Sequence, residues 1–537
     1  MELINQRTKQ IMENCKAIAR QAGLHFDDES LEYIVTNRDM LELSPKVMIP
    51  TLYDYWVHDV EVLKEYGKYK LYPSNPYETV INSRPAISFY NDNNPDWLNT
   101  MIFYHVLGHI DFFQNNLLFE HTWNDDFVGQ ALADKRLIAN LRSEYGRWTD
   151  YSLEFSRSID NISGYFQKVS KMQFPTEKDA SARLSFYFDV FLQEIKQVRS
   201  HEIYNEVARY NALVDADPVI AESLFFSEVR GKYPEFDALF EKESSRVNVE
   251  HYSDILEFIR DNSPLLAIEK NSWMKSVMTI VHNTSMYFAP QIRSKIINEG
   301  WASYWHDMLF RSDEQIKGHE IAYSKTNAGV TSLTRIGLNP YAIGLRLIQY
   351  VEELANKGKL QYYFQKHYGI EYRDEFDQNT GKGREAIFAL RSNFSDFMLI
   401  NTFVDQDFVD MHDLFTVGQR LNEQRGTIEY YIKSRKAEDY KQMLLDSLYH
   451  PPVIEVNLEK TNEKTLYLKH KFEGKQLVKQ YVPEVLIGLE YLWGSEVKLE
   501  TTEIVVSRPP KPEEKPKYEL REVIYHIKDR KTTKKAL

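Results

Sequence analysis

Cysteine is almost absent from this sequence, since Cys15 is the only one among 537 residues. A single cysteine excludes a disulfide framework within the chain, and with it the class of disulfide-stapled secreted domains. The N-terminus MELINQRTKQ also lacks the apolar core of a secretory signal peptide. Together these absences predict a protein of the cytoplasm, where thiols stay reduced.

Long apolar runs and an excess of positive charge are missing as well. No stretch approaches the roughly 18 consecutive apolar residues of a membrane span, so no transmembrane segment is expected. The 79 acidic residues outnumber the 66 Lys and Arg, which gives a net charge of −13. This balance argues against broad nucleic-acid binding, and no nucleic-acid partner is predicted. Only the end departs from it, because 508–537 holds ten Lys/Arg and five Asp/Glu.

Glycine is scarce, with 21 residues, and Asn-Gly turn dipeptides are missing between about 97 and 445. Hairpins are therefore not expected there. Apolar residues recur at helical spacing instead, and the segments end on glycine in several cases. The clearest predicted helices cover 4–22, 130–146, 184–200 and 342–358. The predicted fold is mainly α, with one large helical body over residues 1–447.

The pattern changes at Pro451 and Pro452. Residues 453–458 and 465–470 alternate apolar and polar side chains around a turn-rich segment, which predicts a hairpin. A short helix is expected at 483–493 with Gly494 as its end, followed by strand-like stretches at 496–500 and 503–507. Residues 448–507 are thus predicted to form a small α+β unit. Residues 508–537 are interpreted as a Pro-rich linker and basic tail, in which 518–527 could form one more strand.

Two segments carry residues suited to metal chemistry. IFYHVLGHIDFFQNN places His105 and His109 four residues apart, on one face of a helix. INEGWASYWH supplies Glu299 from another expected helix. Two histidines on one helix and a glutamate from a later one form the ligand set of gluzincin-type zinc enzymes. The sequence therefore predicts a zincin-like site for a divalent metal, with zinc as the expected ion.

The general base of such enzymes is missing, because Val106 occupies the position of the glutamate in HExxH. Asp111 and Glu78 are the nearest candidates for that role. His306 shares the helix face of Glu299 but lies about 10 Å further along the axis, so it is expected to touch substrate or orient ligands. His121 and His282 are further possible contributors.

Simpler interpretations compete with each of these. An HxxxH pair arises by chance in many helices, and Asp111 could cap a helix or pair with a basic group. The aromatic side chains around both motifs are expected in the core. The basic end is more often a solvated extension than a nucleic-acid arm.

The chain resembles the stage V sporulation protein R (SpoVR) family from about Ile18 to Glu500. The resemblance is carried, in this order, by PYETVINSRPAISFYNDNN, HVLGHIDFFQNNLLFEHT, YFAPQIRSKIINEGWASYWH, LNPYAIGLRLIQYVEE and GREAIFALRSNFSDFMLINTFVDQDF, then by VIEVNLEKTNEKTLYLKHKFEGKQL. It implies a link to spore cortex or cell-envelope formation, and as partners a PrkA-type serine protein kinase and a YeaH/YhbH-type protein. Val106 agrees with the family's pattern. The positions that the resemblance singles out are His105, His109, Asn115, Asn116, Asn298, Glu299, Trp301 and His306.

Two classes of function remain open at this point. The first is a metal-dependent hydrolase, acting on an amide bond in a peptide or cell-wall precursor. The second is a non-catalytic regulatory or scaffold protein that works through the kinase system, for instance in stress regulation. In that case the His/Glu cluster is a structural metal site or a buried polar network.

Overall fold

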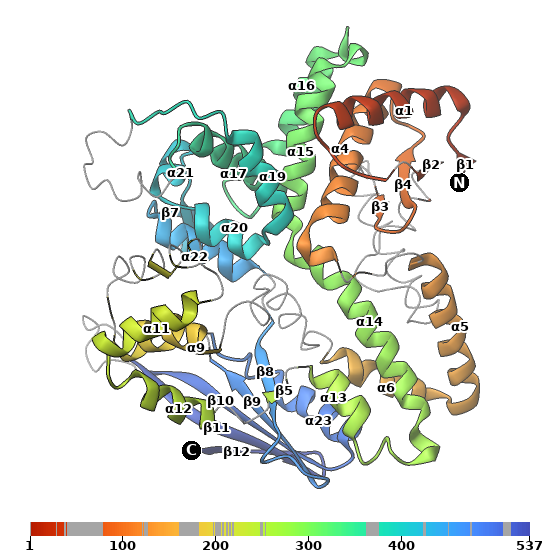
Figure 1. Ribbon diagram of the computed structural model, residues 1–537. Helices are drawn as coiled ribbons and strands as arrows, with labels where there is room; N and C mark the ends of the chain where they lie inside the picture. Colours follow the sequence, from red (N-terminus) through yellow and green to blue (C-terminus); the bar gives the residue numbers. More distant parts are fainter. Residues whose placement is uncertain are drawn as a thin grey trace. The chain divides into compact units, whose positions relative to one another are not determined.

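The computed structural model describes most of the chain in two compact units, Met1–Asn161 with Trp273–Pro451, and Ile162–Ser272 with Pro452–Leu537 (Figure 1). The described residues are 2–36 without 28, 39, 79–122 without 121, 127–159, 182–196, single positions between 198 and 216, 220–246, 251–360 without 253, 375–422, 426–448, 451–472, 475–507 and 517–537. Helix is the main secondary structure, as predicted.

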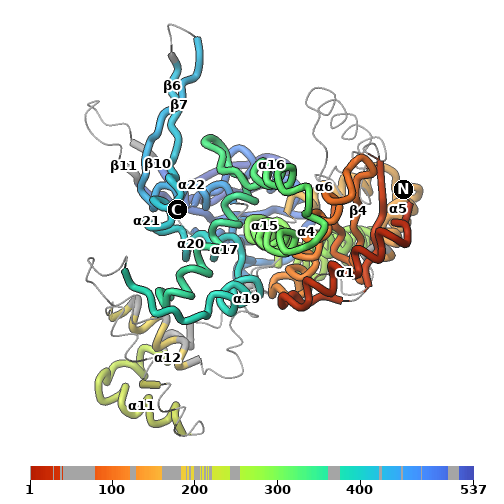
Figure 2. Tube along the Cα trace, turned by 90° about the horizontal axis from the view of Figure 1, so that it is seen from above, coloured from red at the N-terminus to blue at the C-terminus, as the bar shows by residue number. Residues whose placement is uncertain are grey.

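Three helices form the centre of the first unit: α4 (Asp96–Asn115), α15 (Lys295–Ser312) and α17 (Pro340–Asn356). They run side by side in both views (Figure 1, Figure 2). Gly300 and Gly344 let α15 and α17 approach closely, since a β-carbon at Gly300 would lie 2.3 Å from the Gly344 carbonyl carbon. Around these helices lie α1 (Gln6–Gln21), η1 (Leu117–Phe119), α5 (Phe127–Tyr145), α6 (Arg147–Arg157), α14 (Trp273–Arg293), η5 (Glu314–Ile316), α16 (Glu320–Thr331), α19 (Gly383–Asn393), α20 (Asp396–Phe403), α21 (Gln406–Met411) and α22 (Ala437–Ser447).

The predicted helices are present where the sequence placed them. α1, α5 and α17 are each followed by a glycine of positive φ, at Gly23, Gly146 and Gly358, which is the conformation that ends a helix most readily. The segment 184–200 starts as α9 (Ala182–Ser185) and continues as the π-helix η3 (Phe186–Ile195).

Two small sheets in the first unit were not predicted. β1 (Glu2–Leu3), β2 (Ser30–Val35), β4 (Ala86–Asn91) and β3 (Thr79–Ile81) pair in that order. The second is a hairpin of β6 (Thr416–Asn422) and β7 (Thr427–Ser434), whose two strands lie side by side in Figure 2.

The expectation that hairpins are absent between 97 and 445 is therefore wrong. A hairpin does not need an Asn-Gly pair, because a glycine elsewhere in the connection can also adopt a positive φ. Gly426, directly before β7, has a φ of 61°. A cross-strand ion pair of 3.0 Å between Arg420 and Glu429 supports the pairing.

A six-stranded sheet with the order β12-β11-β10-β9-β8-β5 dominates the second unit. β8 (Val453–Asn457) and β9 (Thr465–Lys471) form the predicted antiparallel hairpin. The helix α23 (Val482–Trp493) connects β9 to the parallel β10 (Glu496–Ser507) and ends at Gly494 with φ 84°. It packs on β10 and on β11 (Lys517–Lys528).

The interpretation of 508–537 as a linker and tail is wrong for its larger part. β11 pairs with β10 from Lys517 to Ile527, and β12 (Lys531–Ala536) adds the edge strand. The Pro-rich stretch suggested a domain boundary, but beyond it Val523, Tyr525 and Ile527 stand at every second position of β11 and are buried. The linker, 508–516, lies outside the described residues.

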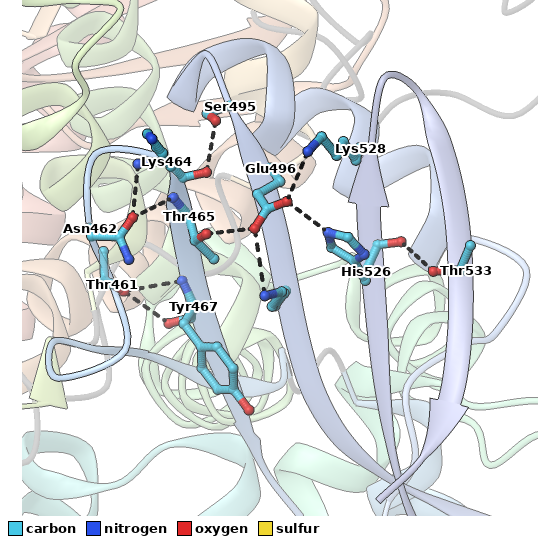
Figure 3. A network of polar contacts seen from close by, with 11 residues as sticks. Thr461, Asn462, Lys464, Thr465, Tyr467, Ser495, Glu496, His526, Lys528 and Thr533 are labelled. Carbon is cyan, nitrogen blue, oxygen red and sulfur yellow. Dashed lines mark hydrogen bonds and ion pairs between the residues drawn. The ribbon is translucent and has the colours of Figure 1, made fainter.

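Polar contacts also attach the terminal strands, as Figure 3 shows. Glu496 accepts a hydrogen bond of 2.7 Å from the Thr465 hydroxyl, and its other oxygen lies 3.2 Å from Nε2 of His526 and 3.8 Å from Nζ of Lys528. One carboxylate on β10 thereby joins β9 to β11.

Residues 162–272 belong to the same unit as this sheet. The division expected from the sequence had instead placed them in the helical body of residues 1–447. They include α11 (Ala221–Lys232), α12 (Phe236–Arg246), β5 (His251–Tyr252), α13 (Ile255–Asn262) and η4 (Glu269–Asn271). β5 pairs with β8, and the Ser263 hydroxyl donates to the Leu492 carbonyl at 2.8 Å. An aromatic cluster around Tyr187, Phe191 and Phe236 links η3 to α11 and α12.

Among the helices that the structure describes, none has the length and apolarity needed to cross a lipid bilayer.

Candidate metal centre

The two histidines lie on α4, a helix enclosed on all sides. Every residue from Thr100 to Phe113 is buried, so the helix has no polar face. His105 and His109 are separated by one turn, and their ring centroids lie 4.6 Å apart at right angles. A buried imidazole pair in such surroundings needs polar partners, because an unsatisfied buried nitrogen is costly.

Glu299 reaches this pair because α15 packs directly on α4. Gly108 lies against Ala302, and a β-carbon at Gly108 would come within 2.8 Å of the Ala302 Cα. The start of α15 is fixed by Asp396 of α20, whose two carboxylate oxygens accept from the backbone amides of Ile296 and Ile297 at 2.9 and 2.8 Å. Burial raises the pKa of Asp396 to about 7, against the effect of these amides.

The three side chains converge although some 190 residues separate His109 from Glu299 in the chain. Oε2 of Glu299 lies 3.6 Å from Nε2 of His105 and 3.6 Å from Nε2 of His109. All three ligand atoms are within 4.8 Å of one another. Ligand atoms at about 2.1 Å from a tetrahedral zinc ion stand about 3.4 Å apart. The donor set and the two measured distances therefore fit a shared cation.

The Nδ1 atoms of both rings face away from Glu299 and have partners of their own. His109 Nδ1 lies 2.9 Å from Oδ1 of Asn298, which can only accept, so this nitrogen carries a hydrogen. His105 Nδ1 lies 2.9 Å from Nδ1 of His306. Asn298 and His306 thus each contact the Nδ1 atom of one of the two histidine rings.

Burial sets the protonation of the cluster. It lowers the pKa of His105 to about 3, and it also lowers the pKa of His306. Burial raises the pKa of Glu299, but the two imidazoles facing it outweigh that effect and hold the pKa below its usual value. An ionised glutamate beside the neutral imidazole of His105 is the state in which these two groups bind metals.

Tyr341, at the start of α17, completes the cluster. Its ring stacks on His105 with centroids 5.9 Å apart, and its side chain hydrogen-bonds Glu299. Sequence reasoning missed this residue, since a tyrosine after Asn-Pro gives no signal beyond a helix start. The pairing of α15 with α17 through their glycines places it here.

Asp111, a predicted catalytic base, is engaged in a different network. Its Oδ1 accepts from the His25 amide and its Oδ2 from Nε1 of Trp301, both at 2.8 Å, and Nε of Arg391 lies 3.4 Å from Oδ2. Burial raises the pKa of Asp111 and lowers that of Arg391. Trp301, predicted to support the metal ligands, donates to this buried carboxylate.

The remaining predicted residues have other positions. Asn115 donates to the carbonyls of His25 and Asp111, and Asn116 caps η1 and donates to the Arg391 carbonyl. His282, on α14, is 3.3 Å from Asn283. Glu78 and His121 lie outside the described residues.

The fold and this cluster define a class: mainly helical proteins in which two helix-borne histidines meet a glutamate from a second helix. The family model "SpoVR like protein" matches residues 3–450, so the chain belongs to the SpoVR-like family. It is similar to the uncharacterized protein YcgB of Escherichia coli K12, with 25% identity over 496 residues, which cover 87% of this chain and 86% of YcgB. No solved structure matches it.

Proposed function

We propose that His105, His109 and Glu299 bind a divalent cation, with zinc as the expected ion, and that the protein is a metal-dependent hydrolase of amide bonds. The observation that carries the proposal is the position of Glu299 Oε2, 3.6 Å from Nε2 of both histidines. This separation exceeds a hydrogen bond, yet it suits three ligands around one ion.

A bound divalent cation would polarise a carbonyl group and lower the pKa of a water molecule on it. The chain itself holds the ligands in place: Asn298 and His306 fix the two rings, and Tyr341 fixes the glutamate. Val106, at the position of the usual base, is fully buried and cannot accept a proton. Glu78 remains the candidate base, because Asp111, the other candidate, is hydrogen-bonded within the fold.

The hydrogen bonds of His306 and Asp111 also support an alternative function. His306 uses Nδ1 for His105 and Nε2 for Asn327, and Asp111 is occupied by Trp301 and its neighbours. If Glu78 does not serve as the base either, the cation would have a structural role. The protein would then be a cytoplasmic regulatory or scaffold protein, working with a PrkA-type serine kinase and a YeaH/YhbH-type partner.

Metal analysis of the full-length protein tests the shared part of both functions. Glu299→Gln and His109→Ala remove a ligand and should each abolish zinc retention, whereas the protein should stay folded. Glu353→Gln is the matched control. Glu353 lies in the last turn of α17 and pairs with Lys357, not with the cluster. Zinc retained by the two ligand variants as by the wild type would refute the metal centre.

Complementation of a deletion strain then separates the enzyme from the scaffold. If the protein acts on peptides or wall precursors of the cell envelope, the metal-free variants should fail at normal abundance and with normal kinase binding. Full complementation by these variants would favour the scaffold.

A further inference from the structure

A chain of hydrogen bonds leads from the surface of α15 to the ring of His105. At its outer end lies Asp307, whose side chain is 24% exposed. Asp307 Oδ1 accepts from Nδ2 of Asn327 at 2.8 Å. Oδ1 of Asn327 is 3.0 Å from Nε2 of His306, and Nδ1 of His306 is 2.9 Å from Nδ1 of His105.

The carboxylate at the outer end, which accepts from Asn327, Arg311 and Tyr323, fixes the direction of every hydrogen bond in this chain. A carboxylate can only accept, so the atom of Asn327 that faces Asp307 must be its amide nitrogen. The carbonyl oxygen of Asn327 is therefore turned to His306 and accepts from Nε2–H. With its hydrogen on Nε2, a neutral His306 has its lone pair on Nδ1.

His105 is the last member of the chain, and its tautomer follows. Its Nδ1 faces the lone pair of His306 and so must carry the hydrogen. The lone pair of His105 then lies on Nε2, which faces Glu299 at 3.6 Å. This is the tautomer in which Nε2 can bind a cation.

Asp307 is itself held in place by two further donors. The Tyr323 hydroxyl and Nε of Arg311 both bond to the same oxygen, Arg311 at 2.8 Å. Tyr323 and Asn327 are neighbours on one face of α16, four residues apart. Asn327, His306 and His105 are buried, so bulk water cannot reorient them.

We propose that Asp307 is a positioning residue of the metal centre, which sets the tautomer of His105 through Asn327 and His306. This inference rests on the proposed metal site. Without an acceptor at 307 the amide of Asn327 is free to turn and present its nitrogen to His306. The hydrogens then shift along the chain, and His105 carries its hydrogen on Nε2, where the cation would bind.

The test is the zinc affinity of full-length protein, measured by competition with a chromophoric chelator. Asp307→Ala should weaken zinc binding about 10–100-fold, as expected for groups that orient a ligand. Asn327→Leu removes the acceptor of His306 and should act alike, which keeps the test valid if Asp307→Ala does not fold. Asp307→Asn should bind zinc as tightly as the wild type. Arg311 and Tyr323 would donate to the amide oxygen of the asparagine, which then takes the place of the carboxylate oxygen.

The control variant changes a nearby carboxylate outside this chain of hydrogen bonds. Glu314, in η5, pairs with Lys317, and Glu314→Gln should bind zinc as the wild type does. The melting temperature of each metal-free variant shows whether a loss of affinity is merely a loss of fold. Wild-type affinity in Asp307→Ala and Asn327→Leu would overturn the inference and leave the metal site standing. A wild-type protein that binds no zinc would overturn both.

Discussion

Gly108 of α4 packs against Ala302 of α15 with no room for a side chain, since a β-carbon there would meet the Ala302 Cα at 2.8 Å. Gly108 precedes His109 directly, and Ala302 lies one turn beyond Glu299. The two helices therefore approach each other closely at the level of the His/Glu cluster. The distance across the cluster depends on this contact.

Gly108→Ala should separate the helices and weaken the site. We expect a loss of about 1–3 kcal/mol in the free energy of unfolding from overpacking, together with weaker zinc binding. Urea unfolding and chelator competition measure the two effects. Gly329→Ala is the control, because that position on α16 has open space around it and alanine favours helix there. Equal behaviour of both variants would contradict the role of the close contact.

How far the sequence predicts this centre can be followed residue by residue. The spacing of His105 and His109 is local, and helical geometry alone puts both rings on one face. Glu299 comes from a distant helix, so only its resemblance to a known ligand pattern indicated it. Asn327 and Tyr341 gave no signal, because nothing local to their helices shows which neighbour they will meet.

The fold shows the same limit. Alternation predicted the hairpin of β8 and β9 and left room for a strand at 518–527, since a strand's two faces are visible in its own residues. Neither the edge strand β12, with its exposed lysines, nor the pairing of β11 with β10 follows from local pattern. Membership of 162–272 in the second unit likewise depends on contacts such as Ser263 with Leu492.

The docking of β11 predicts two different outcomes for two apolar residues on that strand. Ile527 is fully buried, whereas Leu520 is 61% exposed. Ile527→Ala should lower the free energy of unfolding by about 2–5 kcal/mol. Leu520→Ala should change it by less than about 0.5 kcal/mol. Urea unfolding decides the matter, and two equally mild variants would mean that the strand is a detached tail.

Glu503 gives the second unit a dependence on acid. Burial raises the pKa of this carboxyl, but hydrogen bonds with Lys534, Tyr525 and Lys479 outweigh it and lower the pKa to about 2 from 4.5. A depressed pKa means that the stabilisation is complete above pH 4.5 and is lost as the pH falls toward 2.

Glu503→Gln should therefore lower stability at neutral pH and flatten its fall in that acid range. Urea unfolding midpoints measured across this pH range test the prediction. Glu519→Gln is the control, because the Glu519 side chain is 71% exposed and its contact with Arg521 is long, at 3.7 Å. A wild-type acid profile in Glu503→Gln would assign the dependence to other carboxylates.

Asp111 provides the test that separates a structural carboxylate from a catalytic one. Its oxygens satisfy the His25 amide and Trp301 Nε1, and Arg391 lies beside it in the core. Asp111→Ala would leave these donors and a buried guanidinium without their acceptor. Breaking a buried pair in this way costs about 3–5 kcal/mol.

We therefore expect Asp111→Ala to lower the unfolding midpoint strongly while each folded molecule still binds one equivalent of zinc. Glu299→Gln should show the opposite combination, with near-normal stability of the metal-free protein and no bound zinc. Measuring zinc content and urea midpoint on the same preparations distinguishes the two patterns. A stable Asp111→Ala protein that binds zinc normally but fails in complementation would return Asp111 to the role of general base, since only its chemistry would then be missing.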